Sequence, residues 1–448
     1  MTDRILVYGL GVSGLATATR LLVEGAEVVA VDDDDGERPR RVAEGLGIEL
    51  VAAPDQPTLA ALARSVDEIV VSPGVPACHA VFALDASVPV IGEVELAWRR
   101  ARCPLVAITG TNGKTTVTTL VQAMLESSGL RAVAAGNIGL PLLEAVGGDA
   151  EVVVAEVSSF QLALTSTFRP AVGAWVNFSA DHLDWHATVD DYRQAKARLW
   201  ANSGPGDVAV VNVEDPVVRA ASDVARVRGA TVRTFGLSAG DYTVEGGALV
   251  GPDELVVARV EELARAMPHD VVDALCAVAT ASGAGASPEG CRRALLGFRG
   301  LPHRVELVGE ASGVRFYDDS KATTPGAVLA AVAGCAPAVL IAGGRNKGLD
   351  LSVLSAATPH LRGVVAIGEA AEEVAAVFAG SVPLARGRSM AAAVEAAAAM
   401  ASPGDSVVLS PACASFDWYR SYAERGDDFS RRVRALPGFT PPVEGVSR

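Results

Sequence analysis

The first residues that point to chemistry form a glycine-rich loop, Gly110-Thr111-Asn112-Gly113-Lys114-Thr115-Thr116. An apolar run typical of a strand precedes the loop, and an amphipathic helical pattern follows it. Backbone N–H groups in such a loop surround phosphates, a lysine reaches the phosphate that is transferred, and a threonine hydroxyl binds Mg²⁺. The spacing differs from the usual P-loop, whose first glycine would fall at Ile108. The strand–loop–helix context nevertheless predicts that the chain binds ATP.

Three further side chains suit the same phosphate chemistry. Glu156 ends a predicted strand, and His182 follows the next one. Because the carboxyl ends of parallel strands meet at one sheet edge, we expect Glu156 and His182 to be neighbours across adjacent strand ends and to bind Mg²⁺. Lys196 shares its predicted helix face with aromatic and apolar residues. Its amine either keeps its charge in water or, partly buried, is carbamylated by CO₂ and gains a carboxylate-like ligand.

A second glycine motif, Gly9-Leu10-Gly11-Val12-Ser13-Gly14, matches the dinucleotide fingerprint, and Asp32 ends the following strand. Its glycines let the backbone approach a diphosphate, and the N-terminus of the helix favours an anion. The motif therefore favours a diphosphate ligand, which includes a UDP-sugar as well as NAD. No residues suited to hydride transfer are visible elsewhere, so NAD has less support. A tight turn without any ligand is the remaining alternative.

Short β-branched runs alternate with helical patterns along almost the whole chain, which predicts an α/β fold with parallel sheets and helices on both faces. The strands that we expect are 5–8, 28–31, 69–71, 105–109, 151–157, 172–177, 208–212, 231–235, 314–318, 338–342, 363–367 and 406–410. A hairpin with Gly246-Gly247 as its turn is expected within 241–260, and helices are expected at 269–283 and 287–297.

The length of 448 residues suggests about three domains, at roughly 150 residues each. We expect a Rossmann-like N-terminal domain (1–92), a central P-loop-type ATPase domain with a mostly parallel sheet (93–300), and a C-terminal Rossmann-like α/β domain (301–448). Gly297 to Pro302 is interpreted as the linker before the last domain.

Composition excludes several classes of protein. Half of the residues are hydrophobic and 20% are charged, which indicates filled cores rather than disorder. A net charge of −15 argues against non-specific nucleic-acid binding, which needs a cationic face. The six cysteines form no CxxC pair, so reduced thiols in a cytosol are expected. No apolar run reaches the ~18 residues of a membrane helix and no export signal is visible, so we expect a cytoplasmic protein that does not bind membranes.

Taken together, the motifs resemble the Mur ligases, the family that builds the peptide of bacterial cell-wall precursors. The matching segments run in family order along nearly the whole chain: 110–116, Gly136-Asn137-Ile138-Gly139, Glu156-Val157-Ser158-Ser159-Phe160-Gln161-Leu162, Asp181-His182-Leu183-Asp184, Tyr192-Arg193-Gln194-Ala195-Lys196, Pro302-His303-Arg304, Asp318-Asp319-Ser320-Lys321-Ala322-Thr323, Gly343-Gly344-Arg345-Asn346-Lys347-Gly348 and Leu409-Ser410-Pro411-Ala412-Cys413-Ala414-Ser415. Segments 158–162, 319–323 and 410–415 are most similar to the members that add D-glutamate. The Asp-Asn-Pro-Arg segment of the members that add diaminopimelate or lysine is absent.

The resemblance implies an ATP-dependent carbon–nitrogen ligase that adds D-glutamate to UDP-N-acetylmuramoyl-L-alanine, with ATP and two Mg²⁺ ions, acting as a monomer. It implies catalytic roles for Lys114, His182 and Lys196, and ATP contacts at Gly110, Thr111, Asn112, Gly113, Lys114, Thr115, Thr116, Arg304, Asp319 and Lys321. The UDP-substrate would contact Gly11, Ser13, Gly14, Leu15, Ser72, Pro73, Gly74, Asn137, Ser158, Gln161 and His182. D-Glutamate would contact Thr323, Lys347, Ser415, Phe416 and Tyr422; the metal ligands would be Thr115, Glu156, His182 and carbamylated Lys196.

Two positions depart from the family pattern. Relatives often carry His-Asn-x-x-Asn where this chain has Asp270 and Asp273, and Asp33-Asp34 replaces a polar or basic pair near uracil. An Asn amide both donates and accepts hydrogen bonds, whereas an ionised Asp only accepts. We therefore expect rearranged nucleotide contacts at these positions and an unchanged reaction.

Three other functions compete with this interpretation. A folylpolyglutamate synthetase-like ligase would share the phosphate loop and the carbamylated lysine, but the N-terminal GxGxxG domain argues against it. An NAD-dependent oxidoreductase would explain Gly9–Gly14, but not the phosphate loop. A non-catalytic nucleotide-binding regulator should lack Lys114, Glu156, His182 or Lys196, and all four are present.

Overall fold

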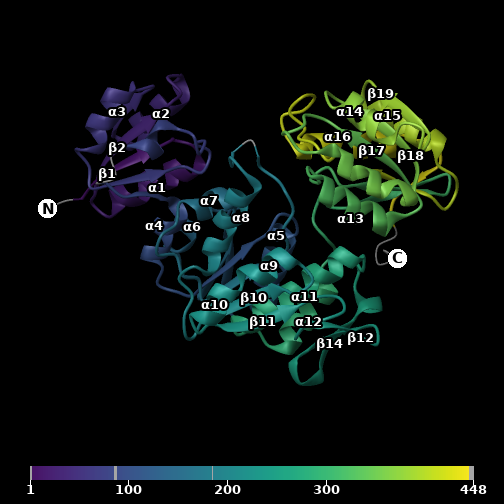
Figure 1. Ribbon diagram of the computed structural model, residues 1–448, viewed down its shortest axis with the longest axis horizontal. Coiled ribbons are helices and arrows are strands. Elements are labelled where there is room, and N and C mark those ends of the chain that lie inside the picture. Colours follow the sequence, from purple (N-terminus) through teal and green to yellow (C-terminus); the bar gives the residue numbers. More distant parts are fainter. Residues whose placement is uncertain (1–2, 85–87, 184, 443–448) are drawn as a thin grey trace. The chain divides into compact units, whose positions relative to one another are not determined.

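The computed structural model describes residues 3–84, 88–183 and 185–442 (Figure 1). The chain forms two compact units. Unit 1 comprises Met1–Phe178, Trp185–Ala258 and Asp273–Leu295, and unit 2 comprises Ser179–Asp184, Arg259–Val272 and Leu296–Arg448.

The first sheet of unit 1 has five parallel strands in the order β3-β2-β1-β4-β5. Ile5 and Val7 of β1 belong to one hydrophobic cluster, whereas Leu6 and Tyr8 belong to another. Both faces are therefore covered, which explains why this strand is an unbroken apolar run. The elements are β1 (Arg4–Tyr8), α1 (Val12–Val23), β2 (Glu27–Asp32), α2 (Glu37–Leu46), β3 (Glu49–Ala52), α3 (Gln56–Ala63), β4 (Glu68–Val71), a 3₁₀ turn (Ala80–Ala83), β5 (Val90–Gly92) and α4 (Glu93–Arg100).

The second sheet of unit 1 has six parallel strands in the order β11-β10-β9-β6-β8-β7. The elements are β6 (Leu105–Thr109), α5 (Lys114–Ser127), β7 (Ala132–Gly136), α6 (Leu142–Ala145), β8 (Val152–Glu156), α7 (Ser159–Ala163), β9 (Val172–Trp175), α8 (Val189–Ala197), a 3₁₀ turn (Arg198–Trp200), β10 (Val208–Asn212), α9 (Pro216–Ala221), α10 (Asp223–Val227) and β11 (Thr231–Phe235). The expectation that the strands before Glu156 and His182 are neighbours is wrong, because β6 lies between β8 and β9. Consecutive parallel strands need not pair, since each is reached by a crossover connection.

A small antiparallel sheet, β12-β13-β14, follows the second sheet and confirms the predicted hairpin. Gly246 and Gly247 form its turn and both have positive φ angles. The elements are β12 (Thr243–Glu245), β13 (Ala248–Gly251), a 3₁₀ turn (Pro252–Glu254), β14 (Leu255–Arg259), a second 3₁₀ turn (Val260–Glu262) and the helices α11 (Pro268–Gly283) and α12 (Pro288–Gly297).

Two buried glutamates at the start of α4 connect neighbouring segments of unit 1. Glu95 accepts hydrogen bonds from the backbone N–H groups of Ser166, Thr167 and Phe168, at 2.9 to 3.1 Å, and pairs with Arg99. Burial alone would raise the pKa of Glu95, but these donors and Arg99 outweigh it and lower the pKa. Glu93 accepts from Leu143 N–H at 2.8 Å, at the start of α6.

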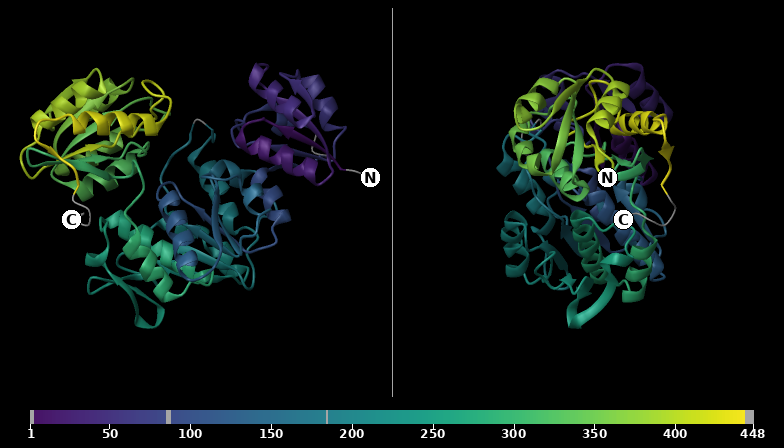
Figure 2. Two further views of the ribbon diagram at one scale, coloured as in Figure 1. Left: turned by 180° about the vertical axis from the view of Figure 1, so that it is seen from behind. Right: turned by 90° about the vertical axis from the view of Figure 1, so that its right-hand side faces the viewer.

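Unit 2 contains a seven-stranded sheet in the order β19-β18-β17-β20-β16-β15-β21, in which only β15 and β21 run antiparallel to their neighbours. Helices α13 and α14 cover one face, and α15 and α16 cover the other (Figure 2). The elements are β15 (Glu306–Ala311), β16 (Val314–Asp318), α13 (Pro325–Cys335), β17 (Ala338–Gly343), a 3₁₀ segment (Leu351–His360), β18 (Leu361–Ile367), α14 (Ala371–Phe378), β19 (Leu384–Gly387), α15 (Met390–Met400), β20 (Ser406–Leu409), α16 (Tyr422–Arg434) and β21 (Phe439–Thr440).

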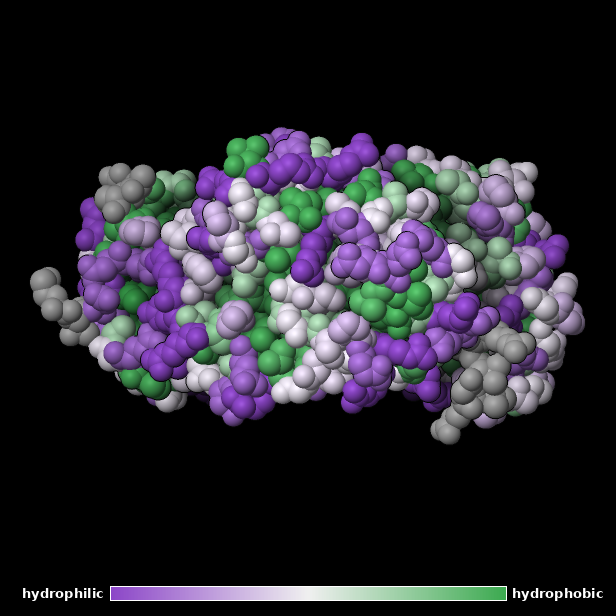
Figure 3. Space-filling model, turned by 90° about the horizontal axis from the view of Figure 1, so that it is seen from below, coloured by the Kyte–Doolittle hydropathy of each residue, from purple (hydrophilic) through white to green (hydrophobic). Residues whose placement is uncertain are grey.

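The α/β class and the mostly parallel sheets are confirmed, and the division at residues 92 and 300 stays a prediction. The six cysteines are free thiols, four of them buried. Among the described residues, no helix is both long and apolar enough to cross a membrane. Hydrophilic and hydrophobic residues are interspersed on the face shown in Figure 3.

Candidate active site

The first glycine motif lies at a pocket of about 400 Å³ in unit 1. The pocket is at the carboxyl ends of β1 and β4, where the connections from the two strands run to opposite sides of the sheet, the usual ligand position in open α/β sheets. Its lining includes Gly11 and Ser13 after β1, and Ser72, Pro73 and Gly74 after β4. Five of the predicted UDP-substrate contacts are thereby brought together around one cavity.

Gly11 and Gly14 differ in what surrounds them. A Cβ atom at Gly14 would lie 1.8 Å from the carbonyl oxygen of Gly9, so this glycine is needed for helix α1 to pack on the turn. A Cβ atom at Gly11 would meet no atom within 4 Å. Packing therefore explains Gly14, whereas the open space at Gly11 leaves room for a ligand to approach the backbone at the start of α1.

The acidic residues beside this pocket are engaged within the chain. Asp32 accepts hydrogen bonds from the N–H groups of Leu10 (2.6 Å) and Asp34 (3.0 Å). Asp33 accepts a hydrogen bond from the hydroxyl of Tyr8 at 2.6 Å. Burial of the phenol raises the pKa of Tyr8, and the Asp33 carboxylate raises it further. An NAD-binding site would need the carboxylate at Asp32 for a ribose hydroxyl. Here the carboxylate holds the glycine turn in place and also lines the pocket.

In the second glycine loop, two lysines converge on one carbonyl group. Lys114 Nζ donates to the carbonyl oxygens of Gly110 and Thr111, both at 2.9 Å. Lys196 Nζ also donates to Gly110, at 2.7 Å, and lies 4.7 Å from the centre of the Tyr192 ring. Lys196 is 1% exposed, which agrees with the buried alternative rather than with an amine in water. The structure thus brings Lys114 and Lys196 together at the phosphate loop.

Glu156 is the acidic member of the same sheet edge. Its Oε1 atom accepts a hydrogen bond from Asn137 Nδ2 at 2.8 Å. Its Oε2 atom is buried and, among the described residues, accepts no hydrogen bond. A buried carboxylate oxygen without a donor is costly unless a cation satisfies it. An oxygen ligand of this kind fits Mg²⁺. Thr115, another predicted metal ligand, lies in the first turn of α5, and its metal role stays a prediction.

Two predicted substrate contacts, Ser158 and Gln161, form the cap of helix α7. Gln161 N–H donates to Ser158 Oγ at 3.2 Å, and Ser158 N–H donates to Gln161 Oε1 at 2.9 Å. This reciprocal pattern is a capping box. The structure therefore accounts for both side chains without a ligand, and their substrate role stays a prediction.

His182 belongs to the segment Ser179–Asp184, which is part of unit 2, whereas Glu156 and Lys196 are in unit 1. Its N–H donates to Asp181 at 2.8 Å, and its Nε2 lies 3.2 Å from the same carboxylate. The shared metal site of His182 and Glu156 stays a prediction. Asp184, the last residue of the Asp-His-Leu-Asp motif, lies outside the described residues.

The predicted D-glutamate contacts lie on loops at the carboxyl ends of three adjacent strands in unit 2. Thr323 follows β16, Lys347 follows β17, and Ser415 and Phe416 follow β20. Backbone hydrogen bonds join the loops: Ala412 N–H donates to Ala322, and Arg345 and Ala414 bond reciprocally, at 2.9 to 3.0 Å. Tyr422 begins α16, and Lys321 Nζ lies 5.1 Å from its ring centre. These residues share one edge of the sheet.

Asp319 is the buried acid at this edge. It accepts hydrogen bonds from Ser410 Oγ (2.7 Å) and from Val305 N–H (3.2 Å). Burial raises the pKa of Asp319 to about 7. Val305 adopts a φ of 45°, which a β-branched residue rarely does, to direct its N–H at this carboxylate. Arg304 and Asp319, two predicted ATP contacts, are thus on interacting segments.

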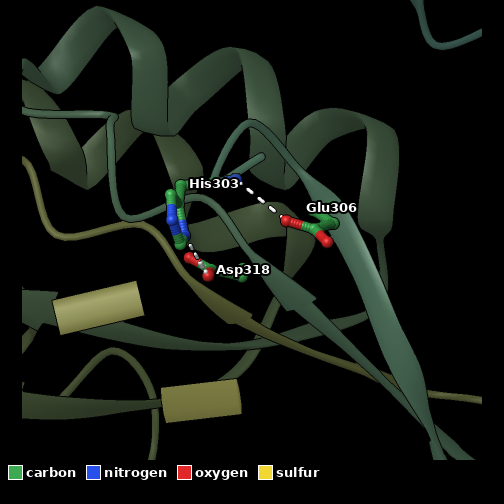
Figure 4. A group of neighbouring side chains, drawn as sticks. All are labelled: His303, Glu306 and Asp318. Atoms are coloured by element: carbon green, nitrogen blue, oxygen red, sulfur yellow. Dashed lines mark hydrogen bonds and ion pairs between the residues drawn. The ribbon is translucent and has the colours of Figure 1, made fainter. Parts of the chain in front are cut away.

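Figure 4 shows a neighbouring group of His303, Glu306 and Asp318, whose candidate ligand atoms lie within 4.8 Å of one another. His303 Nδ1 bonds to Asp318 at 2.7 Å, and the backbone N–H of His303 donates to Glu306 at 3.0 Å. The hydrogen bond to Asp318 raises the pKa of His303. These bonds orient the turn before Arg304, so the group is explained without a metal ion.

Several side chains at the two sheet edges were not among the predicted site residues. His186 is buried and bonds to Ser159 Oγ at 2.9 Å, and Tyr192 OH lies 3.1 Å from Thr111 Oγ1. Arg425 is 1% exposed inside unit 2. An arginine on a charged helix is usually exposed, so the sequence carries no signal for its burial.

The chain matches two known domain families. Residues 108–257 match the Mur ligase middle domain, and residues 303–413 match the Mur ligase glutamate ligase domain. Solved structures of low identity share the fold: UDP-N-acetylmuramate–alanine ligase from Thermotoga maritima (TM-score 0.61, 19% identity, 97% of this chain and 99% of that one) and MurF from Acinetobacter baumannii (TM-score 0.62, 17% identity, 96% and 93%).

Relatives with higher sequence identity cover almost the full chain. The proteins named UDP-N-acetylmuramoylalanine–D-glutamate ligase from Pelotomaculum thermopropionicum and Frankia casuarinae are each 42% identical to it. The matches span 97% of this chain and 98% and 94% of those proteins. Identity at this level over the whole length, together with both domain matches, shows that the chain belongs to the Mur ligase family.

Proposed function

We propose that this chain is an ATP-dependent ligase that joins D-glutamate to UDP-N-acetylmuramoyl-L-alanine in peptidoglycan precursor synthesis. The observation that carries the proposal is the phosphate loop, where Lys114, Lys196 and Glu156 lie at one sheet edge within a chain whose full-length relatives carry that name. The proposal includes three domains (1–92 for the UDP-substrate, 93–300 for ATP and 301–448 for D-glutamate), a monomer, and a cytoplasmic location, where ATP and UDP-sugars are available.

In the first step, the carboxylate of UDP-N-acetylmuramoyl-L-alanine attacks the γ-phosphorus of ATP, so that an acyl phosphate forms and ADP leaves. This step brings two anions together, and it needs cations at the phosphate. Lys114 releases its carbonyl partners and neutralises the phosphate oxygens. Arg304 and Lys321 of unit 2 contribute from the nucleotide side in this proposal.

In the second step, the amine of D-glutamate attacks the acyl carbon, loses a proton and displaces phosphate. Lys347 and the hydroxyl groups of Thr323 and Ser415 hold its carboxylates, since charge-assisted hydrogen bonds suit such groups. Phe416 and Tyr422 are exposed aromatic residues beside them and enclose the amino acid.

Two Mg²⁺ ions complete the proposed site, held by Thr115, Glu156, His182 and Lys196 as a carbamate. When bound, they supply charge neutralisation to the phosphates. The carbamate is favoured by the observed geometry, because two ammonium groups that share the Gly110 carbonyl repel each other. Conversion of Lys196 to an anion would replace that repulsion with attraction to Lys114.

Phosphate release from ATP tests the proposal directly. The assay contains Mg²⁺ and UDP-N-acetylmuramoyl-L-alanine and compares D-glutamate, L-glutamate and no amino acid. We expect release that depends on D-glutamate. Turnover with L-glutamate and a folate instead would move the function to the folylpolyglutamate class, and reduction of NAD without phosphate release would replace it with an oxidoreductase.

A further inference from the structure

The side chain of Arg425 connects the loops of unit 2 that carry the proposed ATP and D-glutamate contacts. Its Nε donates to Ser320 Oγ at 2.9 Å and its Nη2 donates to the Ser320 carbonyl oxygen at 2.8 Å. Its Nη1 donates to the Cys413 carbonyl oxygen at 3.1 Å. Ser320 Oγ in turn donates to the carbonyl oxygen of Tyr422, in the first turn of α16. One guanidinium group therefore joins three segments.

This arrangement is unusual because the charge is buried without an ion pair. Arg425 is 1% exposed, and among the described residues its hydrogen-bond acceptors are the neutral oxygens of Ser320 and Cys413, with no salt bridge to a carboxylate. Burial lowers the pKa of Arg425 to about 10, although Asp417 and Asp318 act in the opposite direction. A buried charge with only neutral acceptors costs stability. An apolar residue of similar volume would avoid that cost, so packing alone does not explain an arginine here.

The surrounding residues leave room for this side chain. A Cβ atom at Gly344 would lie 3.1 Å from Arg425 Nη1 and 2.3 Å from the Ala414 carbonyl oxygen. A Cβ atom at Gly426 would lie 2.2 Å from His303 Nδ1. The glycine at 344 thus allows the backbone to lie against the guanidinium group and Ala414, and the glycine at 426 allows the first turn of α16 to lie against His303.

The three hydrogen bonds set the position of specific predicted contacts. Ser320 lies between Asp319 and Lys321, and Cys413 lies two residues before Ser415. We propose that Arg425 is a positioning residue for the amino-acid substrate: its three hydrogen bonds fix the 320–323 loop against the 413–416 loop. This inference rests on the proposed function.

The order of the expected effects follows from the contacts. Of the proposed D-glutamate contacts, Thr323 lies on one of the two loops that Arg425 joins, and Ser415 and Phe416 lie on the other. The proposed ATP contacts Asp319 and Lys321 lie at the first of these loops alone. The proposed UDP-substrate pocket belongs to unit 1, whereas Arg425 and its hydrogen-bond partners belong to unit 2. The KM for D-glutamate should therefore change most and the KM for ATP less. The KM for the UDP-substrate should stay within about twofold of the wild-type value.

The test compares Arg425→Met, Arg425→Lys and Ser320→Ala with Arg431→Met, an exposed arginine of the same helix that pairs with Asp428. Phosphate release gives kcat and each KM, and thermal unfolding reports folding. We expect a KM for D-glutamate about 30-fold higher in Arg425→Met, as for the loss of one or two charge-assisted hydrogen bonds. Arg425→Lys keeps the charge, so its KM for D-glutamate should rise only about fivefold. Ser320→Ala should show a similar rise, and Arg431→Met should have the KM of the wild type.

A second measurement separates positioning from general damage. Exchange of label between ADP and ATP, with the UDP-substrate but without D-glutamate, reports the first step alone, and Arg425→Met should retain it within a few-fold. A kcat loss with an unchanged KM for D-glutamate, or an equal loss of exchange, would overturn the inference. If Arg425→Met does not fold, an unchanged KM in both Arg425→Lys and Ser320→Ala would overturn it. A wild-type protein without D-glutamate-dependent release would overturn the proposed function, and this inference with it.

Discussion

The two glycine-rich loops of unit 1 have the same local context and opposite electrostatics. Each follows the end of a parallel strand, β1 or β6, and leads into a helix, α1 or α5. The described lining of the first pocket includes Asp32 and Asp33 and no lysine or arginine. At the second loop, Lys114 and Lys196 converge on Gly110. The strand–glycine–helix turn by itself provides only phosphate-binding N–H groups, and added cations decide whether a phosphate is held or transferred.

Removal of the loop cation gives the largest expected effect. Lys114→Met should lower kcat in the phosphate-release assay about 1,000-fold, because electrostatic stabilisation of the transferred phosphate is lost. The control is Arg131→Met, which removes an exposed cation of unit 1 that lies 3.6 Å from Glu151. Activity within tenfold of the wild type would mean that the two loops differ less than their charges suggest.

Lys196 tests whether the second lysine acts as a cation or as a carbamate. Lys196→Ala should lose about 100-fold or more in activity, and acetate or formate should partly restore it by supplying a carboxylate in the vacated space. In Lys196→Met the methionine side chain fills that space, so acetate or formate should not restore its activity. Full activity in Lys196→Ala would refute the carbamate, and equal rescue by chloride would show an ionic-strength effect instead.

The first loop can be separated into its packing and binding parts with two alanines. Gly14→Ala should destabilise the protein by about 2 kcal/mol or more, because its Cβ atom collides with Gly9. Gly11→Ala should leave the unfolding midpoint within a few degrees and raise the KM for the UDP-substrate about tenfold, because only a bound ligand meets its Cβ atom. If Gly11→Ala has the unfolding midpoint of the wild type and an unchanged KM for the UDP-substrate, the turn binds no diphosphate.

The smallest effect is expected at Asp32. Asp32→Asn keeps one acceptor for the N–H of Leu10 and should cost about 1 kcal/mol in the free energy of unfolding. Chemical denaturation measures this cost, and the KM for ATP serves as the internal control because the second loop is unaffected. Binding of NADH by the wild type, measured by fluorescence, and its loss in Asp32→Asn would reverse the interpretation of the first loop.

Local patterns allowed much of the fold to be predicted. The apolar runs at 5–8 and 208–212 are strands because both faces of their sheets are buried, and Gly246-Gly247 forms the expected turn. Strands β3 and β7 were not predicted, since one is half-exposed and the other is rich in alanine. Such segments become strands through pairing with β2 and β8.

Residue types and their spacing are enough to identify the groups that are available: the glycines and Lys114 of the phosphate loop, the acid at Glu156, and the apolar face that buries Lys196. Which of these groups meet depends on the folded chain. The insertion of β6 between β8 and β9, the engagement of Asp32 by backbone N–H groups, and the burial of Arg425 between two loops depend on residues distant in the chain. The physical reason is that spacing encodes local periodicity, whereas strand order and buried polar contacts are set by packing across the whole sheet.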